Sequence, residues 1–320
     1  MICQKEQEEC NKSSCFFIYK YRVLEIKNEI MYNYNFKNPI IQKNKNHYII
    51  KEKGKIYNLY ECADTNKLEE IHDLINTSPI FFKKRYKIIR NNYNKLWSQF
   101  STKKIFIVEY DPKIKNNLFE ILNEKIIITK RYNFIVQNNW KEIWQTRDDI
   151  IEKISKSKTT KKKEFNELID YLFYTAESAI MYVKNEQPDN YNFVVSYKKI
   201  DEISMNNPLN IIIDNAERNI ANQIKRILHE KNNNNKITEV KKIISTCSNY
   251  KISYNKVFAR IMYPSEYFEQ LFYIMEYNDI YDINEKILDI TKDIIEYENS
   301  IKKTYYILAN KKNIKNVDWL

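Results

Sequence analysis

The chain has 320 residues, 43% of them hydrophobic, which is enough to bury a substantial core in one large domain or two lobes. Its 53 basic and 42 acidic residues give a formal charge of +11. Because the two signs are interspersed and no basic stripe forms, we expect no nucleic-acid partner. A single glycine excludes the glycine-rich phosphate loops of many nucleotide-binding proteins.

The five cysteines predict reduced thiols and no metal centre. Their number is odd, and the chain has no Cys-x-x-Cys pair. No apolar run approaches the roughly 20 residues needed to cross a bilayer. Acidic residues also stand near the N-terminus, where an export signal needs positive charge. We therefore expect a cytoplasmic protein without a transmembrane segment.

Residues 1–30 are predicted to be an N-terminal appendage that is either disordered or precedes the true start of the protein. Met31 offers a second initiation site, and the patterned sequence follows it. The stretch from His47 to Glu61 predicts a β-hairpin that turns at Gly54, because glycine readily adopts a positive φ.

A small β-rich N-lobe is predicted over residues 31–138. Besides the hairpin, it contains a short helical pattern at 67–75 and strand patterns at 103–111 and 125–136.

A larger helical C-lobe is predicted over residues 139–320, because the hydrophobic spacing there becomes that of helices. Helices are predicted at 140–154, 165–183, 218–230, 237–247, 254–275 and 283–307, with short strands at 192–200 and 209–214 and a basic loop at 155–164. Strands that come first and helices that come later predict an α+β fold.

Several stretches of the C-lobe, taken in order, resemble the YutH-like spore-coat family, whose members are relatives of the CotS coat proteins. They are WKEIWQTRDDIIEK, AESAIMYV, NPLNIIIDNAERNIANQIK, FARIMYPSEYFEQ and the terminal VDWL. The hairpin at Gly54 fits the N-lobe of that family. The resemblance implies the two-lobed, protein kinase-like fold of aminoglycoside phosphotransferases and choline kinases.

The resemblance also implies where the groups of a working phosphotransferase would lie. Phosphoryl transfer uses a lysine on a phosphate, carboxylates that hold metal, and a base at the acceptor hydroxyl. Active relatives carry the lysine in the third strand, where this chain has Tyr60 as the cofactor-binding position. Their His-x-Asp motif is matched here by Ser196 and Lys198. A protonated lysine has no lone pair with which to accept a proton or bind Mg²⁺.

Asp214 is the residue of the implied site that still suits a metal. It ends the strand at 209–214 and precedes a helix, so its carboxylate is either the N-cap of that helix or a metal ligand. Arg218 and Arg260 are expected to form a structural network with carboxylates such as Asp214.

We therefore predict a non-catalytic, spore-coat-associated protein with a degenerate kinase-like fold, a pseudokinase that acts as a scaffold or assembly factor. It would bind other coat or assembly proteins, need no cofactor, and lie in the cytoplasm or at the forespore or spore coat surface. The sequence leaves its partner and oligomeric state open.

Two alternative functions remain at this point. The first is a small-molecule phosphotransferase with a rewired site, which would use ATP and Mg²⁺ with Asp214 and either Asp201 or Glu202 as replacement carboxylates. The second is a peripheral protein that holds an anionic lipid or polymer through Lys161 to Lys163.

Overall fold

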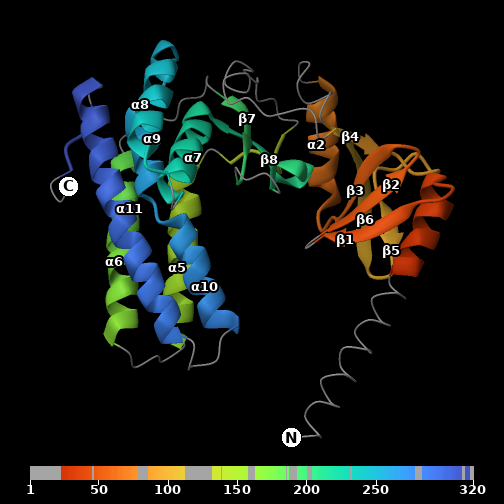
Figure 1. Cartoon of the computed structure of the whole chain (residues 1–320), viewed down its shortest axis with the longest axis horizontal. Helices are drawn as coiled ribbons and strands as arrows, with labels where there is room; N and C mark the ends of the chain where they lie inside the picture. Colours follow the sequence, from red (N-terminus) through yellow and green to blue (C-terminus); the bar gives the residue numbers. More distant parts are fainter. Residues whose placement is uncertain are drawn as a thin grey trace, which may run out of the picture. The chain divides into compact units, whose positions relative to one another are not determined.

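The computed structural model describes residues 23–44, 47–77, 86–111, 132–137, 139–157, 163–184, 186, 193–199, 204–230, 233–277, 283–311 and 314–317. The chain divides into two compact units (Figure 1). Unit 1 comprises residues 1–120, 129–135 and 202–211. Unit 2 comprises residues 121–128, 136–201 and 212–320.

The described part of unit 1 is built on a six-stranded antiparallel sheet in the order β1-β2-β3-β6-β4, with β5 paired to β6. The strands are β1 (Ile40–Asn44), β2 (His47–Glu52), β3 (Lys55–Glu61), β4 (Tyr86–Ile89), β5 (Ser98–Phe100) and β6 (Lys103–Tyr110). The predicted hairpin is confirmed as β2 and β3. Lys53 (φ 48°) and Gly54 (φ 75°) both have the positive φ of a type I′ turn, which suits the twist of the two strands.

A helix over residues 23–34 covers one face of this sheet. Ile26, Ile30 and Tyr34 recur every four residues, so they share one helix face and are buried against Ile50 and Leu59 of the sheet. The predicted appendage is therefore wrong for residues 23–30, which belong to the folded unit. The boundary placed before Met31 falls inside this helix, and residues 1–22 lie outside the described ones.

On the opposite face of the sheet, two tyrosines hold a later part of the chain. The Tyr60 hydroxyl donates to the carbonyl of Asn206 at 3.0 Å, and the Tyr86 hydroxyl donates to the carbonyl of Met205. Both carbonyls belong to the 3₁₀ turn η1 (Ser204–Asn206), which precedes a second turn, η2 (Pro208–Asn210). These bonds attach residues 204–210 to unit 1, although the sequence placed them in the helical lobe.

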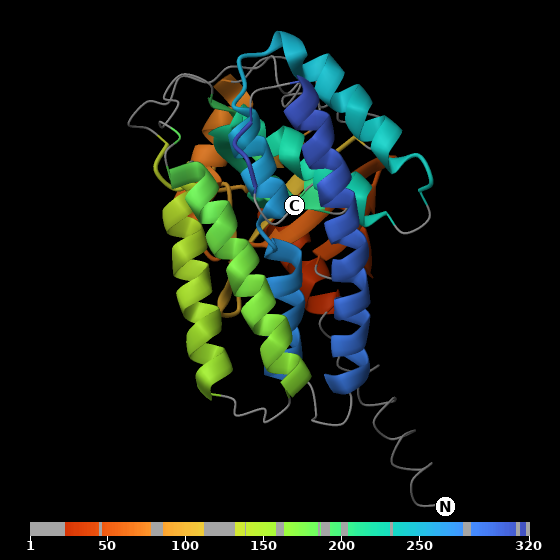
Figure 2. The same cartoon turned by 90° about the vertical axis from the view of Figure 1, so that its left-hand side faces the viewer.

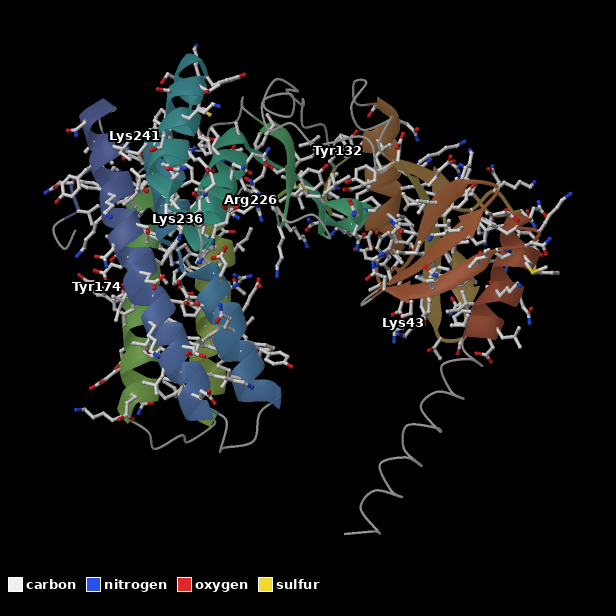
Figure 3. The ribbon with its side chains drawn as sticks, viewed as in Figure 1. Lys43, Tyr132, Tyr174, Arg226, Lys236 and Lys241 are labelled. Carbon is white, nitrogen blue, oxygen red and sulfur yellow. The ribbon has the colours of Figure 1, made fainter. Side chains whose placement is uncertain are left out.

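Helix α2 (Thr65–Thr77), which confirms the predicted helix at 67–75, anchors the end of unit 1. The backbone N–H groups of Asn133, Phe134 and Ile135 donate to the carboxylate of Glu70 at 2.7, 2.9 and 3.2 Å. Next to them, the hydroxyl of Tyr132, labelled in Figure 3, donates to Asp73 at 3.0 Å. Residues 132–135 are thus bound to α2.

Unit 2 is mainly helical. Its described helices are α5 (Trp140–Ser157), α6 (Lys163–Lys184), α7 (Ala216–His229), α8 (Lys236–Thr246), α9 (Tyr254–Met262), α10 (Ser265–Tyr277) and α11 (Ile283–Lys311). Helices α5, α6, α10 and α11 lie side by side along a common direction (Figures 1 and 2). The predicted helix at 254–275 is divided into α9 and α10 at Tyr263 and Pro264, because proline supplies no backbone N–H for a continuous helix.

Two short buried strands, β7 (Phe193–Tyr197) and β8 (Ile211–Asn215), pair with each other in unit 2. Val136 adds a parallel bridge to Ile213, and Gln137 N–H donates to the Ile213 carbonyl at 2.9 Å. Most of the predicted strand at 125–136 lies outside the described residues. None of the described helices combines the length and apolar character that a membrane crossing requires.

Candidate functional site

Helix α7 fixes the end of strand β7, and Lys198 follows that end directly. The Asn219 amide donates to the carbonyl of Val195 at 2.9 Å, and the Asn222 amide donates to that of Tyr197 at 3.4 Å. These bonds satisfy carbonyls of a fully buried strand, where an unpaired group would be costly. Lys198 is exposed beyond the strand end, at the mouth of a cleft in unit 2.

The Asp214 carboxylate is completely buried, and both of its oxygens accept hydrogen bonds. Trp140 Nε1 donates to its Oδ1 and Oδ2 at 2.9 and 3.0 Å, and Arg218 Nη1 donates to Oδ2 at 2.6 Å. The backbone N–H of Asn215 also donates to Oδ1, at 2.7 Å. An arginine and an indole donor together satisfy this anion without a metal ion.

The cap interpretation of Asp214 is wrong, because α7 begins one residue later than that interpretation requires. Asn215 is the N-cap residue, and its side chain makes no capping hydrogen bond. The expected structural network of arginines is confirmed for Arg218, which forms an ion pair with Asp214.

Arg260 of α9 continues this network. Its guanidinium lies 4.9 Å from the centroid of the Trp140 ring, and its Nε donates to Asn222 at 3.0 Å. Burial, together with the positive charge of Arg218, lowers the pKa of Arg260 to about 9. The group is therefore still charged at neutral pH, and its direct contacts are with an aromatic face and an amide, while Asp214 and Glu266 attract it from a greater distance.

These residues line a cleft on unit 2, which we call the basic cleft. Its inner part has a volume of about 290 Å³ and is lined by Gln137, Trp140, Ile143, Trp144, Arg147, Lys198, Lys199, Arg218, Arg260, Tyr263, Ser265 and Glu269. An outer part of about 520 Å³ extends along α7 past Lys225 and Arg226, the second of which is labelled in Figure 3.

An ion pair between the buried Lys225 and the half-exposed Glu266 lies on one side of the outer part of the basic cleft. Lys225 Nζ lies 2.5 Å from Glu266 Oε2 and donates to the Tyr263 carbonyl at 2.9 Å. Burial opposes ionisation of Glu266, but the Lys225 ammonium lowers its pKa below the usual range. Burial also lowers the pKa of His229 to about 4. The imidazole ring of His229 stacks on the ring of Tyr297, with their centroids 4.2 Å apart.

The inner wall of the basic cleft is aromatic. Tyr263 stacks on Trp144 with ring centroids 4.4 Å apart, and its hydroxyl donates to Asp148 at 2.8 Å. Burial raises the pKa of Asp148 to about 6, although this hydrogen bond opposes the shift. The wall is therefore a packed aromatic surface.

The other candidate residues named from the sequence lie outside the basic cleft or outside the described residues. Ser196 lies within β7 with no exposed surface, so solvent and substrate do not reach its hydroxyl. Tyr60 is buried in β3 of unit 1, between His47 and Phe106, and its hydroxyl binds Asn206. Lys163 is exposed and pairs with Glu167 at 3.5 Å. Lys161, Lys162, Asp201 and Glu202 lie outside the described residues.

Sequence reasoning missed Trp140 and Arg147 as parts of the site. Trp140 showed only the helical spacing of a core residue, and its bond to Asp214 joins residues 74 positions apart. No local spacing indicates such a pair. The sequence offered one signal for a basic site. Lys198 and Arg218 lie at or next to positions that the resemblance implies for catalysis, and Arg260 was expected to join their network.

The fold is the kinase-like fold of aminoglycoside phosphotransferases, as two solved structures show. An aminoglycoside phosphotransferase from Alicyclobacillus acidocaldarius matches with a TM-score of 0.58 and 9% identity, over 85% of this chain and 92% of that one. A spectinomycin phosphotransferase in complex with ADP and spectinomycin matches with a TM-score of 0.56 and 14% identity, over 89% and 98%.

The chain belongs to the family described as "Spore coat putative kinase YutH", whose model matches residues 27–304. The predicted family and the predicted kinase-like fold are therefore confirmed. The search of curated proteins finds no match.

Proposed function

We propose that this spore-coat kinase-like protein does not transfer phosphate and acts instead as a scaffold or assembly factor of the spore surface. The observation that carries the proposal is the set of contacts made by the Asp214 carboxylate. Both of its oxygens accept hydrogen bonds from Trp140, and Arg218 adds an ion pair. A carboxylate that served Mg²⁺ would need free oxygen lone pairs facing the metal.

The second support is the charge of the neighbouring position. Lys198 stands where the resemblance implies a catalytic base, and it lies in a cleft that also contains Arg147, Arg218 and Arg260. Positive charge stabilises a transferring phosphoryl group, but a protonated lysine cannot accept the proton of an acceptor hydroxyl. A cationic cleft also repels a polycationic acceptor of the aminoglycoside kind.

The third support is the structural use of Tyr60. The phenol at the position implied for the phosphate-binding lysine is buried and holds η1 to the sheet of unit 1. A phenol carries no positive charge at neutral pH, so it supplies no neutralisation to a nucleotide phosphate. The residue therefore serves the packing of unit 1 in this proposal.

A genetic test in the spore-forming host separates assembly from catalysis. The gene is deleted and complemented with the wild type, with Tyr60→Phe, or with Asp214→Asn, after each purified variant has been shown to fold by circular dichroism. A scaffold predicts that folded variants restore the coat protein composition of purified spores. Loss of coat proteins with a stable, folded Asp214→Asn variant, together with phosphate transfer by the purified wild type, would favour a catalytic role instead.

A further inference from the structure

The inner part of the basic cleft has an excess of positive charge that its own carboxylates do not neutralise. Five cationic side chains and a single carboxylate line it: Arg147, Lys198, Lys199, Arg218 and Arg260 against Glu269. Glu269 already pairs with Lys199 at 2.6 Å and lies 4.0 Å from Arg147. Among the described residues, neither Lys198 nor Arg260 lies within ion-pair distance of a carboxylate.

A buried donor in the same cleft also lacks a partner. Arg218 is 7% exposed, and its Nη1 is bound to Asp214, but its buried Nε has no hydrogen-bond partner among the described residues. Buried polar groups are nearly always satisfied, because an unmet donor costs about 1–3 kcal/mol. A ligand oxygen in the cleft would satisfy it.

The groups that converge here suit a phosphoryl group better than other anions. Three of the five cations are arginines, whose planar donors match the oxygens of phosphate, and Lys198 adds an exposed point charge at the rim. Several fixed cations favour a ligand that carries two or more negative charges on a compact group. Asp214 and Glu269 offset two of the five positive charges, and a monocarboxylate would offset only one of the three that remain.

We propose that the basic cleft binds a phosphoryl group with at least two negative charges, on a small phosphorylated compound or on a phosphorylated side chain of a partner protein. The inference rests on the proposed function in one respect, namely that the group is held and not transferred. Arg218, Arg260 and Lys198 bind its oxygens, and Asp214 keeps Arg218 in place through their ion pair.

Calorimetric titration of the full chain with sodium pyrophosphate, at low ionic strength and without nucleotide or Mg²⁺, tests the proposal. We expect saturable binding that weakens as NaCl is added. Lys198→Ala should weaken it about tenfold, since a charge-assisted hydrogen bond contributes enough for that change. Lys198 is exposed, so this variant should fold like the wild type.

Lys241→Ala is the matched control, because Lys241 is an exposed lysine on α8 outside the basic cleft (Figure 3). It removes the same charge and should leave the affinity within twofold of the wild type. Equal losses of pyrophosphate affinity in the two variants would show that the anion is attracted to the overall positive charge of the protein, and this would overturn the proposal. Absence of binding at millimolar pyrophosphate would rule out a small phosphorylated compound, and the phosphopeptide titration described next would then decide the proposal.

A second pair of titrations identifies the source of the phosphoryl group. A phosphoserine peptide with neutral flanking residues is compared with its unphosphorylated form. Tighter binding of pyrophosphate supports a small compound, whereas tighter binding of the phosphopeptide supports a modified partner protein. Absent binding of both probes refutes the anion site but leaves the lack of phosphotransfer intact. Detected phosphotransfer would contradict the proposed function without affecting the anion site.

Discussion

The indole Nε1 of Trp140 lies 2.9 Å from Oδ1 and 3.0 Å from Oδ2 of Asp214, so one tryptophan N–H is shared by both carboxylate oxygens. Arg218 then completes the shell of the buried carboxylate. Asp214 thus joins α5, β8 and α7 through these contacts.

Trp140→Phe should destabilise unit 2 by roughly 1.5–3 kcal/mol, because it removes a hydrogen bond to a buried charged group while keeping an aromatic ring beside Arg260. Urea unfolding of the full chain, followed by circular dichroism, measures this change. Trp97→Phe is the control. Trp97 is half-buried in unit 1, and its indole has no hydrogen-bond partner among the described residues. Equal effects of the two substitutions would contradict the role given to Trp140.

Ile26→Ala and Ile30→Ala should each lower the free energy of unfolding by about 2–5 kcal/mol, because both side chains are buried in the core of unit 1. Leu24→Ala, at an exposed position of the same helix, should change it by less than about 0.5 kcal/mol. Thermal or urea unfolding measures all three. A chain that began at Met31 would lack both isoleucines, and wild-type stability of such a chain would contradict this account.

Glu70→Ala should loosen the end of unit 1, because it removes the acceptor of three backbone N–H groups at residues 133–135. The expected cost is roughly 1–3 kcal/mol. Hydrogen exchange should show faster exchange of these three amides. Glu69→Ala, which removes an exposed acid from the neighbouring position, should leave their exchange unchanged. Unaltered protection in the Glu70 variant would refute the anchoring role.

The contribution of His229 to the stability of unit 2 should fall as the pH drops from about 6.5 to about 4. Burial lowers the pKa of this histidine to about 4, so the unfolded chain binds its proton first and protonation favours unfolding. The His229 contribution to the free energy of unfolding changes by at most about 1.4 kcal/mol per pH unit. Lys225 and Glu266 face His229, and Asp148, whose pKa is raised to about 6, gives the opposite slope over part of this range.

His229→Phe isolates that contribution, because the phenyl ring can keep the stacking on Tyr297 while a buried nitrogen without a partner is removed. Unfolding free energies of both proteins are measured from pH 4 to pH 7. The difference in unfolding free energy between the wild type and the variant should change by at most about 1.4 kcal/mol per pH unit. The variant should lose less stability in acid than the wild type. Parallel curves would show that His229 does not titrate as the structure implies.

The sequence predicted elements whose signals are local. Gly54 marked the turn between β2 and β3, and helical spacing placed the helices of unit 2 to within a few residues. Strands β1, β4 and β5 were missed because three to five residues show too little alternation to be distinguished from a loop. The helix at 23–34 was missed because a second methionine suggested a boundary inside it.

The candidate site was predictable only in part, because its decisive contacts join distant segments. The resemblance indicated Lys198 and Asp214, and the structure places Arg218 between the basic cleft and Asp214. The role of Trp140 depends on how α5 lies against β8, and the bond between Tyr60 and η1 depends on the course of the chain after β7. Neither arrangement has a signature in residue spacing.

The most direct test of the central claim is a transfer assay with radiolabelled ATP, Mg²⁺ and candidate acceptors that include small alcohols, amino alcohols and spore coat extract. Because Asp214 is held by Trp140 and Arg218, we predict no labelled product above the level seen without protein. Labelled product that forms with the wild type and disappears with a folded Asp214→Asn variant would contradict the account.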